Sequence, residues 1–391
     1  MNDPVYVVRC PDYDHAEEKM EMLFSMLGGM SRFVKPEEKI VLKVNLLQPA
    51  APDQAVTTHP RIVAAVARLV KEAGAFPIIA DSPGAGYKYT SKTLDTLYRK
   101  TGMIDAAKVS GAELNFDTTV KPVSFPAGKL IRHFEVIGPV ATADGVLGVC
   151  KLKTHTLMSI TGAVKNNFGV IPGLSKPGYH AKLHDKAQFA DMLLDLAEYV
   201  SPRLSIMDAV IGMEGDGPGV AGVSRPVGLL LGSVNPLALD IVASEIVGLR
   251  REQNPLLLAA AKRGATPSDI AQVEVVGADA QAIRVPGYRL PATVDELGIR
   301  QHLSWWQKPM GPFIKDWLSQ AVRVVEKKCV GCGICRESCP AGAIAMTLGK
   351  RKRAVIDDKL CIRCYCCHEL CPEGAVELRR SLMHKVLGVG V

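Results

Sequence analysis

Nine of the eleven cysteines lie in the last 63 residues, at spacings that suit iron–sulfur clusters rather than disulfides. The pattern C-x2-C-x2-C-x3-C-P occurs twice, and 32 residues separate equivalent cysteines. Three closely spaced thiolates can ligate three irons of one [4Fe–4S] cubane, and the cysteine before proline then ligates the other cluster. We therefore expect two [4Fe–4S] clusters, one held by Cys329, Cys332, Cys335 and Cys371 and the other by Cys361, Cys364, Cys367 and Cys339.

This repeated segment resembles the two-cluster bacterial ferredoxins, which are small α+β domains with pseudo-two-fold symmetry. Two zinc sites with four cysteine ligands each would be the alternative, although zinc does not require a third cysteine and a proline-marked fourth in both copies. Cys366 lies between two expected ligands and has no place in the pattern, so we expect a small buried thiol there. Because thiolate ligands need a reducing compartment, we expect a cytoplasmic protein.

The net charge of +7 is concentrated at the C-terminal end, where residues 321–391 hold 13 Lys or Arg and 7 Asp or Glu. Each oxidised cluster with four thiolates adds about −2, which removes most of this local excess. We therefore expect no nucleic-acid partner. The sequence also has no apolar run of the roughly 18 residues that a membrane-spanning helix needs.

Short aliphatic runs alternate with helical patterns over residues 1–300, as expected for a large, mostly parallel sheet in an α/β domain. The predicted strands are Val5–Val8, Ile40–Val44, Pro77–Ala80, Val146–Val149, Leu204–Met207, Leu229–Leu231 and Val273–Val276. The predicted helices are Pro60–Ala73, Ala187–Tyr199 and Pro236–Val247. We expect the α/β domain to be followed by a Trp-rich linker or docking segment at 301–322, with membrane-surface binding as its alternative, and by the ferredoxin-like domain at 323–391.

Polar residues follow several predicted strands, at the edge where open α/β sheets bind ligands. Lys43 and Asn45 close one strand, Asp81 closes the next, and Asp208 follows a third. The stretch from Lys151 to Asp185 is the richest, because cations, amides and a glycine-containing loop follow a strand directly. Such a combination suits an anionic ligand, and its candidate residues are Lys151, Lys153, His155, Lys165, Asn166 and Asn167.

Two further features near this edge have more than one interpretation. Residues 212–222 contain five glycines, which indicates either a mobile loop or a close backbone approach to a ligand. The segment is neither a P-loop nor a dinucleotide fingerprint, so we assign it no nucleotide. His180 and His184 are four residues apart and could share a helix face, so a zinc or iron site there is an alternative to a solvated basic loop.

As a set, KLKTH…TGAVKNNFGVIPG, VLKVN, ADSPG and MDAVIGMEGDGP resemble the family catalogued as domain of unknown function 362, over residues 38–250. In that family a large α/β domain often carries a C-terminal two-cluster ferredoxin domain, and the chemistry is not assigned. A shorter pattern, H…TG…K…PG, is similar to the lactate racemase family, whose members use a nickel-pincer nucleotide.

We expect an iron–sulfur oxidoreductase that takes electrons from a ferredoxin-like or other electron-transfer protein and passes them to an anionic small molecule at the strand ends. Lys43, Asn45, Asp81, Lys151, Asn166 and Asn167 are the expected substrate-binding residues, and Lys153, His155, Lys165 and Asp208 the expected catalytic ones. His155 is the first candidate for proton delivery, because histidine ordinarily titrates near neutral pH. We expect four or more of six strand-end residues to line one cleft that opens toward the cluster domain: Lys43, Asp81, Lys153, His155, Lys165 and Asp208.

Two other functions fit the same motifs. The protein could be a dedicated electron carrier, with its α/β domain docking to a partner enzyme. It could also be a non-redox enzyme whose clusters are structural or sensory. The oligomeric state is left open by the sequence.

Anaerobically purified protein should contain about eight irons and eight acid-labile sulfides per chain, because two cubane clusters require them. Its brown colour should bleach with dithionite. Metal analysis and visible absorbance measure both properties, and half that iron, or zinc in its place, would contradict the two-cluster assignment.

Overall fold

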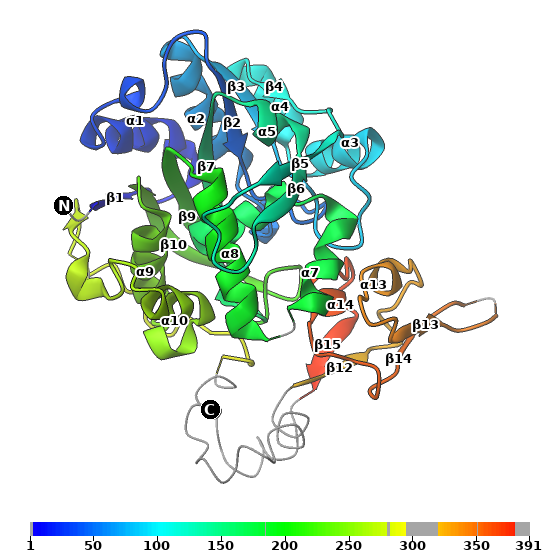
Figure 1. The fold of residues 1–391 in the computed structure, drawn as a ribbon. Helices are drawn as coiled ribbons and strands as arrows, with labels where there is room; N and C mark the ends of the chain where they lie inside the picture. The colour runs from blue at the N-terminus through cyan, green and yellow to red at the C-terminus, as the bar shows by residue number, and fades with distance from the viewer. Residues whose placement is uncertain (1–2, 184, 280–281, 295–319, 350, 380–391) are drawn as a thin grey trace.

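The computed structural model describes residues 3–183, 185–279, 282–294, 320–349 and 351–379. A nine-stranded sheet forms the centre of the large domain, in the order β11-β1-β10-β9-β7-β2-β3-β4, with the short β8 paired to β7 (Figure 1). The strands are β1 (Val5–Arg9), β2 (Lys39–Lys43), β3 (Phe76–Ala80), β4 (Glu113–Leu114), β7 (Gly145–His155), β8 (Ser159–Ile160), β9 (Leu204–Glu214), β10 (Val223–Ser233) and β11 (Val275–Val276).

The sheet is mostly parallel, which confirms the predicted α/β class. The run β4-β3-β2-β7-β9 is parallel throughout, whereas β10 pairs antiparallel with both β9 and β1. All seven predicted strands are present, but β7 and β9 extend well past their predicted ends. Both long strands are buried along nearly their whole length, as expected for central strands covered on both faces.

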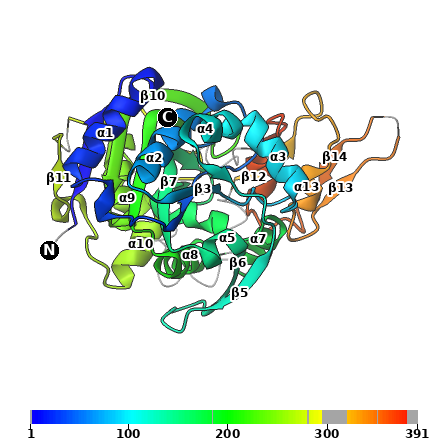
Figure 2. The ribbon, with the colours of Figure 1, turned by 90° about the horizontal axis from the view of Figure 1, so that it is seen from above.

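Helices cover both faces of the sheet, and the view from above separates the two layers (Figure 2). One layer contains α1 (Ala16–Met26), α2 (Pro60–Glu72), α3 (Ser91–Lys100) and α4 (Met103–Ser110). The other contains α5 (Gly138–Thr142), α6 (Gly162–Asn166), α8 (Lys186–Val200), α9 (Pro236–Val247) and α10 (Pro255–Lys262). The three predicted helices are α2, α8 and α9. In α2, Pro60 occupies the first turn and the buried residues Ile62, Val63, Val66 and Val70 form one face.

The small C-terminal domain, called here the cluster module, repeats one pattern twice. It pairs β12 (Ala321–Val324) with β15 (Val376–Arg379) and β13 (Ile344–Met346) with β14 (Ala354–Ile356), both antiparallel. The short helices α13 (Ile334–Glu337) and α14 (Cys366–Glu369) each begin after a residue with left-handed backbone, Gly333 and Tyr365. The structural repeat therefore follows the repeat in the sequence.

The cluster module packs against the edge of the sheet at which the parallel strands end (Figure 1). Two glycine-rich loops make this contact. Their glycines have no side chain, so these backbones can lie closer to the module than any other residue would allow. A Cβ atom on Gly84 would lie 2.5 Å from Leu370 Cδ2, and one on Gly219 would lie 2.0 Å from the carbonyl oxygen of Glu369. Within residues 212–222, Gly219 thus serves a close backbone approach to the module.

Two smaller elements complete the described chain. A separate antiparallel hairpin joins β5 (Val120–Ser124) to β6 (His133–Ile137), and it lies beside α7 (Lys176–Lys182).

The tryptophan-rich segment at 301–319 lies outside the described residues, so its docking role stays a prediction. In the parts of the chain that the structure describes, no helix is long and apolar enough to cross a membrane.

Replacing Gly219 by Ala should loosen the module from the sheet edge, because the added methyl group would overlap the Glu369 carbonyl. Overpacking of this kind costs roughly 1–3 kcal/mol, so the melting temperature of the cluster-loaded protein should fall. Gly178→Ala in α7 is the matched control, since a Cβ there meets no atom within 4 Å. Equal melting temperatures for the two variants would contradict this packing.

Candidate functional site

All eight predicted cluster ligands are free thiols within the cluster module. Burial raises the pKa of Cys335 to about 11, and the thiols that raise it further are Cys332, Cys371 and Cys329. Burial also raises the pKa of Cys361, with Cys364 and Cys339 among its neighbours. Cys371 thus lies near thiols of the first repeat and Cys339 near thiols of the second, as cross-ligation would require. Cys367 has neighbours in both predicted sets, so the division of the ligands between two clusters stays a prediction.

The same residues do not converge on a single point. No three His, Cys, Asp or Glu side chains in the described ranges gather as they would around one metal ion. Cys366 is 1% exposed, which agrees with its expected role as a buried thiol.

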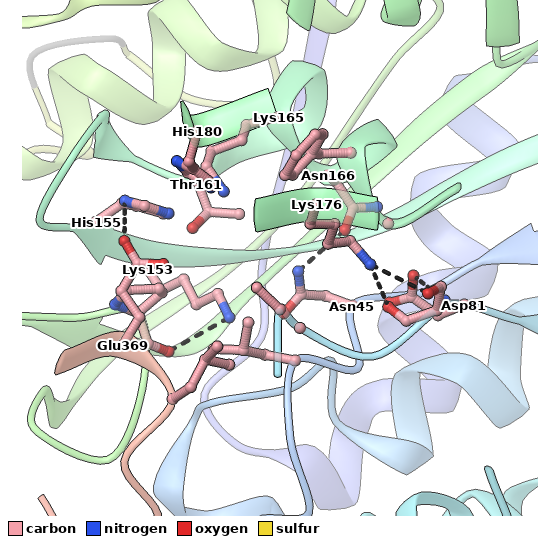
Figure 3. A pocket seen from close by; sticks show the side chains of 18 residues that line it. Asn45, Asp81, Lys153, His155, Thr161, Lys165, Asn166, Lys176, His180 and Glu369 are labelled. Atoms are coloured by element: carbon pink, nitrogen blue, oxygen red, sulfur yellow. Dashed lines mark hydrogen bonds and ion pairs between the residues drawn. The ribbon is translucent and has the colours of Figure 1, made fainter. Parts of the chain in front are cut away.

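A cavity of about 60 Å³ lies between the strand ends of the large domain and the cluster module (Figure 3). The ends of β2, β3 and β7 form one wall, α6 and α7 form another, and α14 of the module closes it. Four of the six residues expected in one cleft line it: Asp81, Lys153, His155 and Lys165. Asn45 and Asn166 also line it, and the module contributes Glu369 and Leu370.

Lys43 lies directly behind the cavity wall. Its ammonium is 3.0 Å from Asp81 Oδ1, and both side chains are buried. Asp81 also accepts hydrogen bonds from the backbone N–H groups of Leu46, at 2.6 Å, and Ser82, at 2.8 Å. Gly169 packs over this pair, because its Cβ would lie 2.1 Å from Asp81 Oδ1. The pair therefore fixes the ends of β2 and β3 rather than offering a free charge.

Asp208 and Lys151 do not line the cavity, contrary to the expectation that they would. Lys151 Nζ lies 2.8 Å from Asp208 Oδ2 across β7 and β9, and both side chains are fully buried. Tyr13 donates to Asp208 and accepts from Lys151, and the His59 backbone N–H donates to the same carboxylate. A register shift between Lys151 and Lys153 separates this group from the cavity.

Asn167 is the other expected site residue outside the cavity. Its side-chain amide donates to the carbonyl oxygens of Ala163 and Val164, one turn back along its own helix. It is buried there and stabilises the end of α6. Asn166, its neighbour, donates to the Lys43 carbonyl and accepts from Asn45, so these two amides join the strand end to α6.

Three lysines face the cavity, and they differ in their partners. Lys153 donates to the carbonyl oxygens of Val56, at 2.6 Å, and Pro218, at 3.5 Å. Lys176 donates to Pro83 O, Ser82 O and Ser82 Oγ. Among the described residues, Lys165 has no oxygen partner, and its ammonium only lies 5.8 Å from the centre of the Phe168 ring.

Burial lowers the pKa of all three lysines. For Lys153 the nearby Lys165 ammonium lowers it further, and the pKa of Lys176 falls to about 7. These shifts follow from removing ammonium groups from water and placing them near one another. A bound anion would favour the charged form of each lysine.

His155 is held in a single tautomer by its own loop. Its Nδ1 accepts a hydrogen bond from the Leu157 backbone N–H at 3.1 Å, so the proton of the neutral ring is on Nε2. That nitrogen faces the cavity on the side of Thr161 (Figure 3). Glu369 Oε1 lies 3.4 Å from Nδ1, but Nδ1 is already an acceptor and no ion pair forms. Burial, with Lys165 and Lys153, lowers the pKa of His155 well below its usual value.

His155 therefore offers a hydrogen bond from a neutral ring, and the premise that it titrates near neutral pH is not met. Lys176 and Glu369 are cavity residues with a pKa of about 7 that the sequence analysis missed, because burial lowers the first and raises the second. Glu369 was missed because only the docking of the module brings it to the strand ends. His180 lines the cavity and stacks on Phe189, whereas His184 lies outside the described residues, so the proposed metal pair is untested.

Comparison with known sequences identifies both domains. The sequence model of the family described as Domain of unknown function (DUF362) matches residues 40–245. A second model, described as a 4Fe-4S dicluster domain, matches residues 328–375. The chain is also 33% identical over 256 residues to the "Thylakoid-associated protein sll1697" of Synechocystis sp., and this match covers 64% of the chain and 75% of that protein.

Among solved structures, the chain is similar to the lactate racemase apoprotein from Thermoanaerobacterium thermosaccharolyticum. The TM-score is 0.40 and the identity 12%, and the match covers 63% of this chain and 57% of that one. A likeness at this level does not establish a shared fold or activity.

The depressed pKa of Lys176 predicts a pH dependence of stability. Its pKa is about 7 in the folded protein and 10.5 in an ordinary chain, so the unfolded chain binds more protons between these values. Stability should therefore rise with pH over this range, by up to about 1.4 kcal/mol per pH unit. Lys176→Met removes this contribution, and the melting temperature of the wild type relative to the variant should increase from pH 7 to pH 9.

The exposed Lys92 on α3 provides the control, since Lys92→Met should leave the pH dependence of melting like that of the wild type. Parallel melting curves for the wild type and Lys176→Met across this pH range would show that Lys176 is charged in the folded protein at pH 9.

Proposed function

We propose, from the premise that the chain belongs to the DUF362 family and carries a 4Fe–4S cluster-binding domain, that it is an iron–sulfur oxidoreductase. Low-potential electrons would pass from the cluster module to an anionic small molecule in the cavity. One observation carries this proposal: Glu369 and Leu370 line the cavity, and they lie in the chain between the ligands Cys367 and Cys371. The substrate and the clusters would thus share one wall.

Two clusters fit the thiols that are present, each with three ligands from one repeat and the prolyl cysteine of the other. When bound, the clusters supply single electrons at low potential. The buried thiols Cys335, Cys367 and Cys371 face inward, whereas Cys332 is exposed. The exposed side suits contact with a ferredoxin-like or other electron-transfer protein, which is the expected source of the electrons.

The protein's own residues would bind the substrate, exclude water and deliver protons. Lys165 and Lys153 place positive charge at the cavity, and the neutral His155 ring donates one hydrogen bond from Nε2. Leu370 and Phe168 cover apolar sides of the cavity. Lys176 is the proposed proton donor, because a group with a pKa near 7 can both hold and release a proton at neutral pH.

The second candidate is an electron carrier that docks to a partner enzyme. The exposed Cys332 beside Val330, which is 64% exposed, favours a contact surface for another protein on the module. This surface serves either function, because an oxidoreductase also needs a reductant. The cavity separates the two candidates, since a carrier has no need of cations enclosed beside its clusters.

Dithionite-reduced protein, freed of excess reductant under argon, should reoxidise when the substrate anion is added, and its visible absorbance should recover. Lys165→Met should slow this recovery by about tenfold or more, because the loss of a charged hydrogen bond costs roughly 1.5–3 kcal/mol. Reoxidation by oxygen should be unchanged in the variant, as should its iron content. Equal rates in both proteins with every anion that reoxidises the wild type would favour the carrier.

A further inference from the structure

Several polar atoms around the cavity have no partner within the described part of the chain. They include His180 Nδ1, Thr161 Oγ1, Asn45 Oδ1 and Glu369 Oε1. His180 and Thr161 are 5% and 4% exposed, so water outside the protein does not satisfy them. A buried polar group without a hydrogen bond costs roughly 1–3 kcal/mol. Thr161 Oγ1 and His180 Nδ1 are therefore available to a ligand or to water held in the cavity.

Two of these groups, on Thr161 and His180, lie at the end of the cavity where Lys165 is found. Figure 3 shows Lys165, Thr161, His155 and His180 directed toward the same end of the cavity. Three of them can donate hydrogen bonds to one acceptor: the Lys165 ammonium, the Thr161 hydroxyl and the Nε2–H of His155. A donor set that includes a cation without an oxygen partner suits a negatively charged oxygen.

The backbone around Lys165 is held firmly, so the donor set is built in advance. Asp240 on α9 accepts from the backbone N–H of Val164 at 3.0 Å and also from that of Ala163. These bonds fix the first turn of α6, which carries Lys165. Gly162 has φ 62°, and a Cβ on it would lie 2.2 Å from Asp240 Oδ1. Only glycine allows this contact, so the position of α6 depends on it.

The size of the cavity limits the ligand. A volume of about 60 Å³ holds a few water molecules, or a single ligand of about four or five non-hydrogen atoms. The strand ends, α7 and the cluster module enclose it, with Leu370 and Pro218 on the module side. A nucleotide or a phosphorylated sugar would extend well beyond this volume.

We propose that this cavity binds a compact oxyanion, such as a simple carboxylate, bicarbonate or nitrate, with one of its oxygens on Lys165, Thr161 and His155. This inference rests on the proposed function in one respect: the electron acceptor would be an anion of this same class. It concerns binding alone and holds for the oxidised protein as well as the reduced one.

Anion binding can be measured by the melting temperature and by calorimetry on the oxidised, cluster-loaded, full-length protein. Sodium acetate, bicarbonate and nitrate are the probes, at constant ionic strength. Gluconate is the matched anion control, because it carries the same carboxylate on a body too large for the cavity. We expect at least one compact anion to bind and to raise the melting temperature, and we expect gluconate to have no effect.

Lys165→Met should weaken that binding by about tenfold or more. Thr161→Val should weaken it less, and it is the smaller change if Lys165→Met does not fold. Lys92→Met, on the exposed face of α3, should bind like the wild type. Equal binding of gluconate, undiminished binding in both cavity variants, or no binding of any compact anion would overturn the inference.

The outcomes also separate this inference from the proposed function. If a compact anion binds through Lys165 but never reoxidises the reduced clusters, the binding site is supported and the oxidoreductase activity is contradicted. If only a larger compound reoxidises the clusters and no compact anion binds, the oxidoreductase activity is supported and the compact-anion site is contradicted.

Discussion

The close contact of two glycine-rich loops with the Glu369–Leu370 segment of the cluster module is the constraint on which the cavity depends. Gly84 and Gly219 allow the module to approach until Leu370 and Glu369 close the strand-end cavity. Lys153 and Lys165 line the cavity that this contact closes. There they lose water, their pKa values fall, and a charged ligand becomes the best available partner for them.

Two buried ion pairs of the large domain are structural and offer no free charge to a ligand in the cavity. Lys43 with Asp81 and Lys151 with Asp208 are each complete, because each acid also accepts backbone hydrogen bonds or a hydrogen bond from a tyrosine. Each pair ties neighbouring segments together. Lys165 is partly exposed and has no ion-pair partner among the described residues, although the nearby Glu369 raises its pKa against the effect of burial. A cation beside a cavity that lacks a direct oxygen partner distinguishes a binding site from these structural networks.

Spacing made the cluster-binding domain predictable, because a cubane fixes the separation of its cysteine ligands along the chain. The ends of β2 and β3 were predictable from where apolar runs give way to Lys43 and Asp81, whereas β7 continues to His155, past its predicted end at Val149. The sequence did not predict that Lys153 lines the cavity while Lys151 does not. The register shift between these two residues leaves no signal in the residue pattern. Glu369 could not be predicted as a site residue for another reason. It lies in sequence among predicted cluster ligands, and only the docking of the two domains brings it to the cavity.

The placement of Glu369 and Leu370 has a thermodynamic consequence for the proposed function. Both residues lie in the segment between Cys367 and Cys371, which belong to different predicted cluster sets, so the cavity borders the ligand segments of both. A negative charge in the cavity opposes the addition of negative charge nearby, and by linkage added electrons weaken the binding of the anion by the same factor. Lysine protonation offsets this opposition, because each proton taken up by the cavity compensates one electron. A cavity with several lysines of lowered pKa is therefore well suited to hold an anion beside a reducible centre.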